Sequence, residues 1–267
     1  MPSFPTPEPI VAHIEVVAGS VRLTAGDRLD TVVDVRPRDP SRASDVRAAE
    51  HARVEFGNGR LTVAAGPKML ALGRGGAVNV DIALPSRSRL QASTASADVH
   101  ADGLLGDCRF SSASGRVTLD AVEGDLKADT ASGDVGATSV LGCVSISTAS
   151  GDAVVQALDG ELNFQAASGG LTVGSLRGNA RAQTASGSTV VTTAVNGSLS
   201  ARTGSGDVEI GVPHGTAARL DVSTSSGAVR NRLQPSDGPA DGDRTLDVHA
   251  RTGSGDIVVR RFDQAMG

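Results

Sequence analysis

Apolar and polar residues alternate in short runs through most of the chain, and glycine interrupts these runs. In one such stretch Val135 and Ala137 form an alternating pair, and Val144 and Ile146 form another. A period of two residues is typical of a strand with one buried face, whereas a helix needs apolar residues three and four positions apart. Because glycine recurs every eight to ten residues, the pattern disfavours helix across residues 94–260 and predicts short extended segments.

A motif of the type T-A-S-G-D-V occurs nine times, and its fourth residue is glycine in every copy except the first, which has Ala97. The first six copies start at a constant interval, at positions 94, 112, 130, 148, 166 and 184, and the last three start at growing intervals, at positions 203, 224 and 252. Two glycine-marked corners in each unit predict two or three short strands per unit. Serine is the third residue of every copy, at Ser96, Ser114, Ser132, Ser150, Ser168, Ser186, Ser205, Ser226 and Ser254. The second glycine column consists of Gly106, Gly124, Gly142, Gly160, Gly178 and Gly197.

One unit of this length cannot bury its own apolar positions, but stacked units can. We therefore predict an all-β, right-handed parallel β-solenoid with coils of about 18 residues, in which equal side chains lie above one another about 4.8 Å apart. The alternative is an antiparallel meander in which each unit is one hairpin. A strict period favours the solenoid, because a meander requires only alternation.

The regularity of the repeat divides the chain into four parts. We expect residues 1–9 to be a disordered tail and residues 10–92 to form capping strands and early irregular coils. The solenoid repeats follow over residues 93–261 with an insertion loop at 234–244, and residues 262–267 form a tail. The capping strands at the N-terminal end would protect backbone groups that a bare solenoid end leaves unpaired.

Local patterns give finer expectations for the N-terminal part. Ala18 and Gly19 resemble a hairpin turn between two alternating runs, and residues 54–65 resemble a second hairpin around G-N-G. Residues 38–52 are charged and alanine-rich and fit either a short helix or an exposed loop. We expect a mobile loop over residues 66–76 and an extended segment over residues 77–84.

Composition and charge exclude several classes of function. The net charge is −5, so the sequence lacks the basic stripe of a nucleic-acid-binding protein. Aromatic residues are 2% of the chain, with no Trp or Tyr, so the stacking platforms of sugar and single-strand grooves are missing. We see no signal peptide and no apolar run of membrane-spanning length, which predicts a cytoplasmic protein that does not insert into a membrane. Cys108 and Cys143 lie two coils apart, beyond disulfide reach, and we expect both in or near the core.

No residue pattern indicates a catalytic, cofactor or metal site. The five histidines, His13, His51, His100, His214 and His249, show no metal-ligand spacing, and the sequence contains no nucleophile elbow or phosphate-binding loop.

Two polar columns of the repeat have alternative interpretations. A recurrent aspartate, at Asp98, Asp134, Asp152, Asp207 and Asp256, fits turn capping better than calcium binding, because the calcium-binding repeat motif is missing. The Thr-x-Ser ladder at 94/96, 130/132, 148/150 and 184/186 could form a flat hydroxyl face of the ice-binding kind, or its hydroxyls could satisfy turn backbone.

The recurrent T-A-S-G-D-V and V-x-G-x-L segments, preceded by the strand-rich lead IEVVAGSVRLTAGD, resemble a family of bacterial β-strand-repeat proteins of unknown function described as candidate adhesins. The resemblance covers residues 10–261. Relatives include toast-rack-like domains in envelope-stress regulators, which implies a protein-binding module without catalytic residues. We therefore predict a non-enzymatic scaffold or interaction surface whose partner is an unknown protein or a second copy. The alternatives are a self-assembling filament of the bactofilin kind and a carbohydrate-active β-helix.

Overall fold

The computed structural model describes residues 2–66, 76–234 and 242–262, and it divides into two compact units, Met1–Gly136 and Ala137–Gly267. Within the described residues the chain forms nineteen strands and a single helix. Along the strands, buried and exposed residues alternate, as the sequence pattern predicts. The corners of the coils coincide with the glycine columns. The all-β parallel solenoid is confirmed, and its handedness stays a prediction.

The N-terminal unit combines parallel coils with an antiparallel cap. The long strands β2 and β7 pair in parallel, and β8 and β9 continue the parallel pairing from β7. The capping pairs β1–β3, β3–β6 and β4–β5 are antiparallel. Its elements are β1 (Ser3–Pro5), β2 (Val11–Gly26), β3 (Asp30–Pro37), α1 (Ala43–Glu50), β4 (Arg53–Gly57), β5 (Arg60–Ala65), β6 (Val78–Pro85), β7 (Arg89–Leu105), β8 (Cys108–Ser114), β9 (Val117–Glu123) and β10 (Leu126–Ser132).

Two local expectations in this unit are wrong. Ala18 and Gly19 form no hairpin, because β2 runs through them as one strand whose two halves both pair in parallel with β7. Gly19 turns the coil there with φ +123°, so a glycine corner replaces the expected turn. The tail over residues 1–9 is ordered at Ser3–Pro5, since the Phe4 ring stacks on Phe56 with centroids 5.4 Å apart.

Other local expectations hold. Strands β4 and β5 form the predicted hairpin around Asn58 and Gly59, both with positive φ, and β6 covers the predicted extended segment. The charged stretch after β3 contains the helix α1, whose Asp45 accepts a hydrogen bond from the backbone N–H of Ala77 (3.0 Å). The expected loop over residues 66–76 lies almost wholly outside the described residues.

The C-terminal unit stacks coils in a parallel register. Ala153 on β12 lies beside Leu171 on β13, and Leu171 lies beside Thr189 on β14, so each residue pairs with the same position of the next repeat copy. The next step, from Thr189 to Val208 on β15, is one residue longer because β14 contains an additional residue. Its elements are β11 (Val135–Ser150, which begins at the unit boundary), β12 (Ala153–Ser168), β13 (Leu171–Ser186), β14 (Thr189–Ser205), β15 (Val208–Pro213), β16 (Thr216–Ser226), β17 (Val229–Asn231), β18 (Arg244–Ser254) and β19 (Ile257–Phe262).

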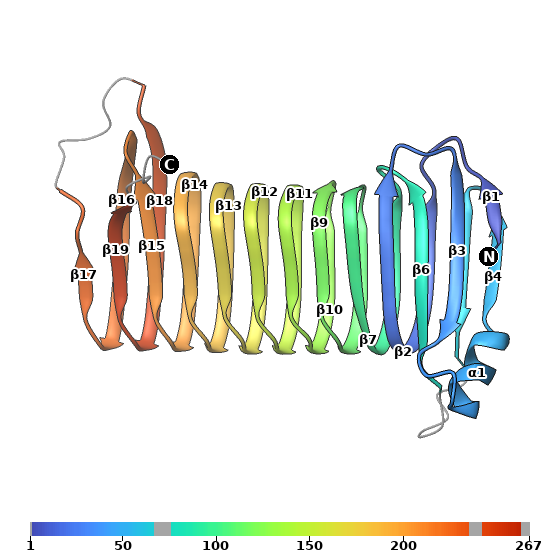
Figure 1. The fold of residues 1–267 in the computed structure, drawn as a ribbon. Helices are drawn as coiled ribbons and strands as arrows, with labels where there is room; N and C mark the ends of the chain where they lie inside the picture. The colour runs from blue at the N-terminus through green and yellow to red at the C-terminus, as the bar shows by residue number, and fades with distance from the viewer. Residues whose placement is uncertain (1, 67–75, 235–241, 263–267) are drawn as a thin grey trace. The chain divides into compact units, whose positions relative to one another are not determined.

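The last two coils stack out of chain order. Strand β14 pairs with β18, and β18 pairs on its other side with β16, so β18 lies between them (Figure 1). Likewise β19 lies between β15 and β17. The inner coil is covered by a neighbour on each side: Val248 and Ile257 are fully buried, whereas Leu220 on the outer strand β16 is only half-buried.

The loop expected at 234–244 connects these two coils. Residues 235–241 lie outside the described residues, and β18 begins at Arg244. The chain thus passes from the outer coil of β16 and β17 back to the inner coil of β18 and β19. Of the expected tail 262–267, Phe262 ends β19 and the rest lies outside the described residues.

The core consists of the predicted apolar columns. Val117 and Val135 in the N-terminal unit and Leu171 in the C-terminal unit are each at most 2% exposed. Equal residues lie beside one another in neighbouring coils, as Ser168, Ser186 and Ser205 do. The serine ladder therefore reports the register of the strands directly.

The exchanged coil order predicts the outcome of a cross-linking experiment. In a Cys143→Ser background, we expect Ser200→Cys/His249→Cys to form a disulfide, because these residues lie on neighbouring strands about 4.8 Å apart. The matched pair Ser200→Cys/Asp221→Cys should remain reduced, because two rungs separate these residues by about 9.6 Å. Mass spectrometry of the linked peptides distinguishes them. Stacking in chain order would give the opposite result.

Candidate functional site

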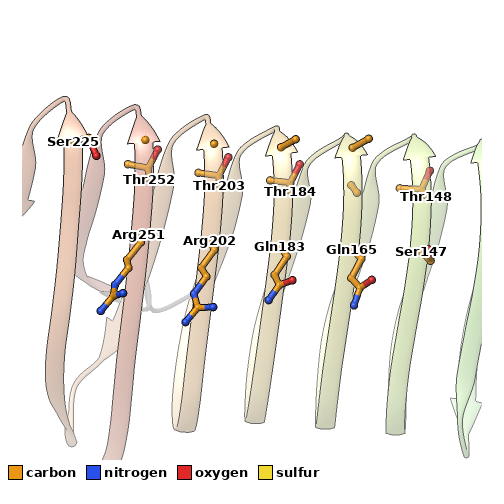
Figure 2. Close-up of a pocket in the computed structure, with 15 residues that line it drawn as sticks. Ser147, Thr148, Gln165, Gln183, Thr184, Arg202, Thr203, Ser225, Arg251 and Thr252 are labelled. Atoms are coloured by element: carbon orange, nitrogen blue, oxygen red, sulfur yellow. The ribbon is translucent and has the colours of Figure 1, made fainter.

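A shallow groove of about 890 Å³ crosses the strands of the C-terminal unit (Figure 2). One side of the groove is a row of long polar side chains, Gln165 on β12, Gln183 on β13, Arg202 on β14 and Arg251 on β18. These four residues are register partners in successive strands, so their side chains form one row with one residue per rung. We call this surface the Gln/Arg groove.

Small residues form the floor of the groove. Two positions after each member of the polar row, the strand carries alanine or glycine, and all four of these small residues line the groove. A strand alternates its side chains between two faces, so the small residues point to the same side as the polar row and leave space beside it. They are Ala167, Ala185, Gly204 and Gly253.

The threonines between these two columns point into the coil. Thr184, Thr203 and Thr252 are less than 9% exposed. Each Oγ1 donates a hydrogen bond of 3.0–3.2 Å to the backbone carbonyl of a corner glycine in the adjacent coil. Thr130 and Thr148 are buried in the same way. The hydroxyls of Thr184, Thr203 and Thr252 therefore satisfy turn backbone and are not part of an exposed hydroxyl face, whereas Ser132, Ser150 and Ser186 of the same ladder are exposed.

The groove carries positive charge at its β14–β18 end. Arg202 and Arg251 are register partners and both are exposed. The Arg251 guanidinium lies 3.7 Å from the Asp221 carboxylate, which also contacts the His249 ring at 3.3 Å. Within the described ranges Arg202 makes no ion pair. Asp221 thus contacts Arg251 and His249, and Arg202 keeps an unneutralised positive charge.

The aspartate column caps turns, as predicted. In the C-terminal unit, Asp152 accepts a hydrogen bond from the Gly170 N–H (2.7 Å), and Asp207 accepts one from the Asp256 N–H (2.8 Å). In the N-terminal unit Asp98 does the same for the Arg116 N–H (2.9 Å). Each carboxylate therefore joins its own coil to the next one along the stack. The part of the chain that the structure describes contains no cluster of three or more His, Cys, Asp or Glu suited to a metal ion.

The capping bond at the outer coil predicts a pH dependence of stability. The Ala228 N–H, which donates to Asp256 at 2.9 Å, and the nearby Arg230 guanidinium hold the pKa of the Asp256 carboxyl below its usual value. A carboxyl group whose pKa is lower in the folded state than in the unfolded state stabilises the fold at pH values above its unfolded-state pKa. This stabilisation is lost as the pH falls through the folded-state pKa. We expect the difference in Tm between the wild type and Asp256→Ala to be largest near pH 7 and to shrink below about pH 4. An equal difference at pH 7 and pH 3 would contradict this role.

The histidines and cysteines do not assemble into a site among the described residues. His13 contacts Glu15 at 3.0 Å and His100 contacts Asp102 at 2.9 Å, both on the protein surface. Burial raises the pKa of the Cys108 thiol to about 12, which makes it unreactive. The expectation of a core position is confirmed for Cys108 and wrong for Cys143, whose side chain is exposed.

A second depression, in the N-terminal unit, is a weaker candidate. It is lined by Asp98, His100, Arg116 and Asp134 among others. Its charged groups already have partners: the Arg116 guanidinium lies 3.4 Å from Asp134, and Asp98 caps the Arg116 backbone. The Gln/Arg groove, with its unneutralised arginine, is the better candidate.

Sequence reasoning predicted no binding residues and missed the Gln/Arg groove. The signal was present, because Gln165, Gln183, Arg202 and Arg251 each stand three positions before the serine of their repeat copy. The in-register column becomes visible only when β18, rather than β16, is placed next to β14. Chain order would have put Ser223 beside Arg202.

One family model and several solved structures match the chain. The family model described as Toastrack DUF4097 matches residues 14–260. A candidate adhesin from Bacteroides fragilis is 11% identical with a TM-score of 0.47, over 97% of this chain and 95% of the other. A candidate adhesin from Parabacteroides distasonis is 13% identical with a TM-score of 0.43, over 96% of each chain. A candidate cell adhesion protein from Clostridium sporogenes is 10% identical with a TM-score of 0.26, over 97% of this chain and 98% of the other. No curated protein matches the chain.

Proposed function

Because the chain belongs to the Toastrack DUF4097 family, we propose that it is a non-catalytic binding module that contacts a protein partner through the Gln/Arg groove. The observation that carries the proposal is the in-register row of Gln165, Gln183, Arg202 and Arg251 beside a floor of small residues. A row of rigid strands presents these side chains at fixed spacing, and such preorganisation reduces the entropy lost on binding.

The groove chemistry supports binding rather than catalysis. Its lining contains Gln, Arg, Ser, Thr, Ala and Gly, but no Asp, Glu, His, Cys or Lys among the described residues. General acid–base catalysis relies mainly on these missing residue types, and nucleophilic serine needs a base within hydrogen-bond reach. The hydroxyls of Thr184, Thr203 and Thr252 are already bonded to backbone carbonyls.

Site-specific photo-cross-linking in the native cell tests the proposal. The full chain would carry a benzophenone side chain at Gln183, in the groove, or at Gln156, an exposed residue in the other half of a coil in the same unit. We expect Gln183 to capture a defined protein and Gln156 not to capture it. The captured protein, once purified, should bind the wild-type chain in titration calorimetry. Capture at Gln156 alone, or at neither position, would refute the groove as the contact surface.

The filament alternative has one observation in its favour. In the described residues β16 pairs only with β18, so its other edge is open, and Leu220 and Val222 on it are half-buried while Val229 is 43% exposed. Open strand edges pair readily with other chains. If the chain self-assembles, the molar mass measured by light scattering will rise with protein concentration. A charged residue in place of Val222 will suppress this rise. A monomer at all concentrations excludes this alternative.

The location of the protein and the carbohydrate-active alternative can each be tested. No helix in the described ranges is both long and apolar enough to cross a bilayer. The cytoplasmic location stays a prediction, which fractionation of the native cell tests. Turnover of a polysaccharide by the purified chain would favour the carbohydrate-active alternative and contradict a non-catalytic role.

A further inference from the structure

We propose that the Gln/Arg groove takes an extended acidic peptide segment, whose carboxylates bind Arg202 and Arg251. This inference rests on the proposed function and names the chemistry of the partner. Arg202 on β14 and Arg251 on β18 are register partners, so their backbones are separated by one strand spacing of about 4.8 Å.

The two arginines leave positive charge without an internal partner. Like charges on neighbouring strands repel one another and weaken the pairing. Asp221 is the only carboxylate that the described residues place in ion-pair distance of Arg251, at 3.7 Å, and it also contacts His249. Arg202 makes no ion pair in the same ranges. Arg181, exposed on β13 two positions before Gln183, is a second arginine for which these ranges show no ion pair. A bound anion would neutralise this end of the groove.

Arginine favours a carboxylate in this position. Its planar guanidinium matches the two oxygens of a carboxylate and forms paired, charge-assisted hydrogen bonds with them. Two guanidiniums one rung apart can each hold one acidic side chain of the same ligand. The chain as a whole is acidic, with a net charge of −5, so the local positive charge contrasts with its surroundings and orients an acidic ligand.

The other half of the groove fits a peptide backbone. Gln165 and Gln183 each offer an amide that both donates and accepts hydrogen bonds, which is the complement of a peptide group. The floor of Ala167, Ala185, Gly204 and Gly253 leaves space for a chain to approach. Three rung steps span about 14 Å, which is the length of about four extended residues.

The same features disfavour two other classes of ligand. No aromatic side chain lines the groove among the described residues, so sugar rings and nucleic-acid bases have no surface on which to stack. Asp247 stands four positions before Arg251 on the same face of β18, and its carboxylate would repel a phosphate backbone that continues past the arginines. A short acidic peptide can place its carboxylates on the arginines without extending over Asp247.

Fluorescence anisotropy with labelled hexapeptides tests the inference on the full chain. The probes are hexaglutamate and its neutral counterpart hexaglutamine. The groove variant is Arg202→Gln/Arg251→Gln, which the fold should accept because glutamine already occupies this column at Gln165 and Gln183. The control, Arg109→Gln/Arg177→Gln, removes the same charge from exposed arginines outside the groove.

We expect hexaglutamate to bind the wild type and the control with equal affinity. Its affinity for the groove variant should be lower by about tenfold or more. Binding should also weaken as salt rises, and hexaglutamine should not bind. Equal binding of hexaglutamate to the groove variant and the wild type would overturn the inference. The inference would also be overturned if oligogalacturonate bound through Arg202 and Arg251 while hexaglutamate did not bind. The ligand would then be an acidic sugar.

The outcome separates this inference from the proposed function. If Gln183 captures a protein partner in the cell but the groove variant binds that partner as well as the wild type does, the groove is the contact surface and the acidic peptide is wrong. If Gln183 captures no partner, the proposed function itself fails. Binding of hexaglutamate that requires both arginines supports both statements.

Discussion

Replacing Gly197 by alanine is expected to lower the free energy of unfolding by about 3 kcal/mol or more. Gly197 has φ +102°, a conformation that residues with a Cβ rarely adopt, and a Cβ there would overlap the backbone carbonyl oxygen of Gly178 in the adjacent coil. The neighbouring coil cannot move away, because a Cβ at Gly178 would overlap Gly160 in the same manner and the three corners stack in contact. Urea unfolding followed by circular dichroism measures the loss.

Gly215→Ala is the matched control for this variant. Gly215 also has a positive φ, +73°, but a Cβ there would meet nothing within 4 Å. Gly215→Ala therefore introduces backbone strain without a collision between coils. We expect it to lower the free energy of unfolding by about 1 kcal/mol. If both variants lose the same stability, the close approach of stacked coils is not the reason for the glycine column.

Replacing Phe164 by alanine should have an effect of similar size, about 3–5 kcal/mol. Phe164 is 0% exposed and is the largest buried side chain of the C-terminal unit, and its register partner on β13 is Ala182. A large ring beside a small residue fills the narrow interior of the coil, so its removal leaves a cavity that rigid strands cannot close. The same urea experiment gives the change in free energy.

Two controls define what the Phe164 result means. Gln165→Ala alters the next residue, which points outward, and should change stability by less than about 0.5 kcal/mol. Phe164→Leu keeps an apolar side chain in the core and should lose less stability than Phe164→Ala. Equal losses for Phe164→Ala and Gln165→Ala would mean that the inward and outward columns have been assigned wrongly.

Much of the fold follows from the sequence because the repeat encodes it twice. The serine ladder defines the register, and the alternating columns define inside and outside, so the burial of Val117, Val135 and Leu171 is predictable. The hairpin around Asn58 and Gly59 is also predictable, since these residues favour the positive φ that tight hairpin turns need.

The errors arose where one local pattern fits two structures. Gly19 lies between two alternating runs, which describes a hairpin turn and a solenoid corner equally well, and only the parallel pairing with β7 distinguishes them. The order of the last two coils is a further feature that the sequence pattern leaves open. Both β16 and β18 carry the repeat motif, so the motif alone does not reveal that β18 takes the inner position.

The candidate site depends on that coil order. Gln165, Gln183 and Arg202 form a column that the spacing of the repeat copies already defines. The charge of the groove, however, requires Arg251 from the last repeat copy to lie beside Arg202. Chemical motifs gave no signal, because a binding row distributed over four coils has no fixed short spacing in the sequence.

Chemical footprinting of arginines tests the central claim, that the Gln/Arg groove is the contact surface, on the unaltered chain. The chain would react with phenylglyoxal alone and with the protein partner captured through Gln183, and mass spectrometry would measure the modification of each arginine. We predict that Arg202 and Arg251 react in the free chain and are protected by the partner, while Arg109 and Arg177 react equally in both states. Equal modification of Arg202 and Arg251 with and without the partner would contradict the claim.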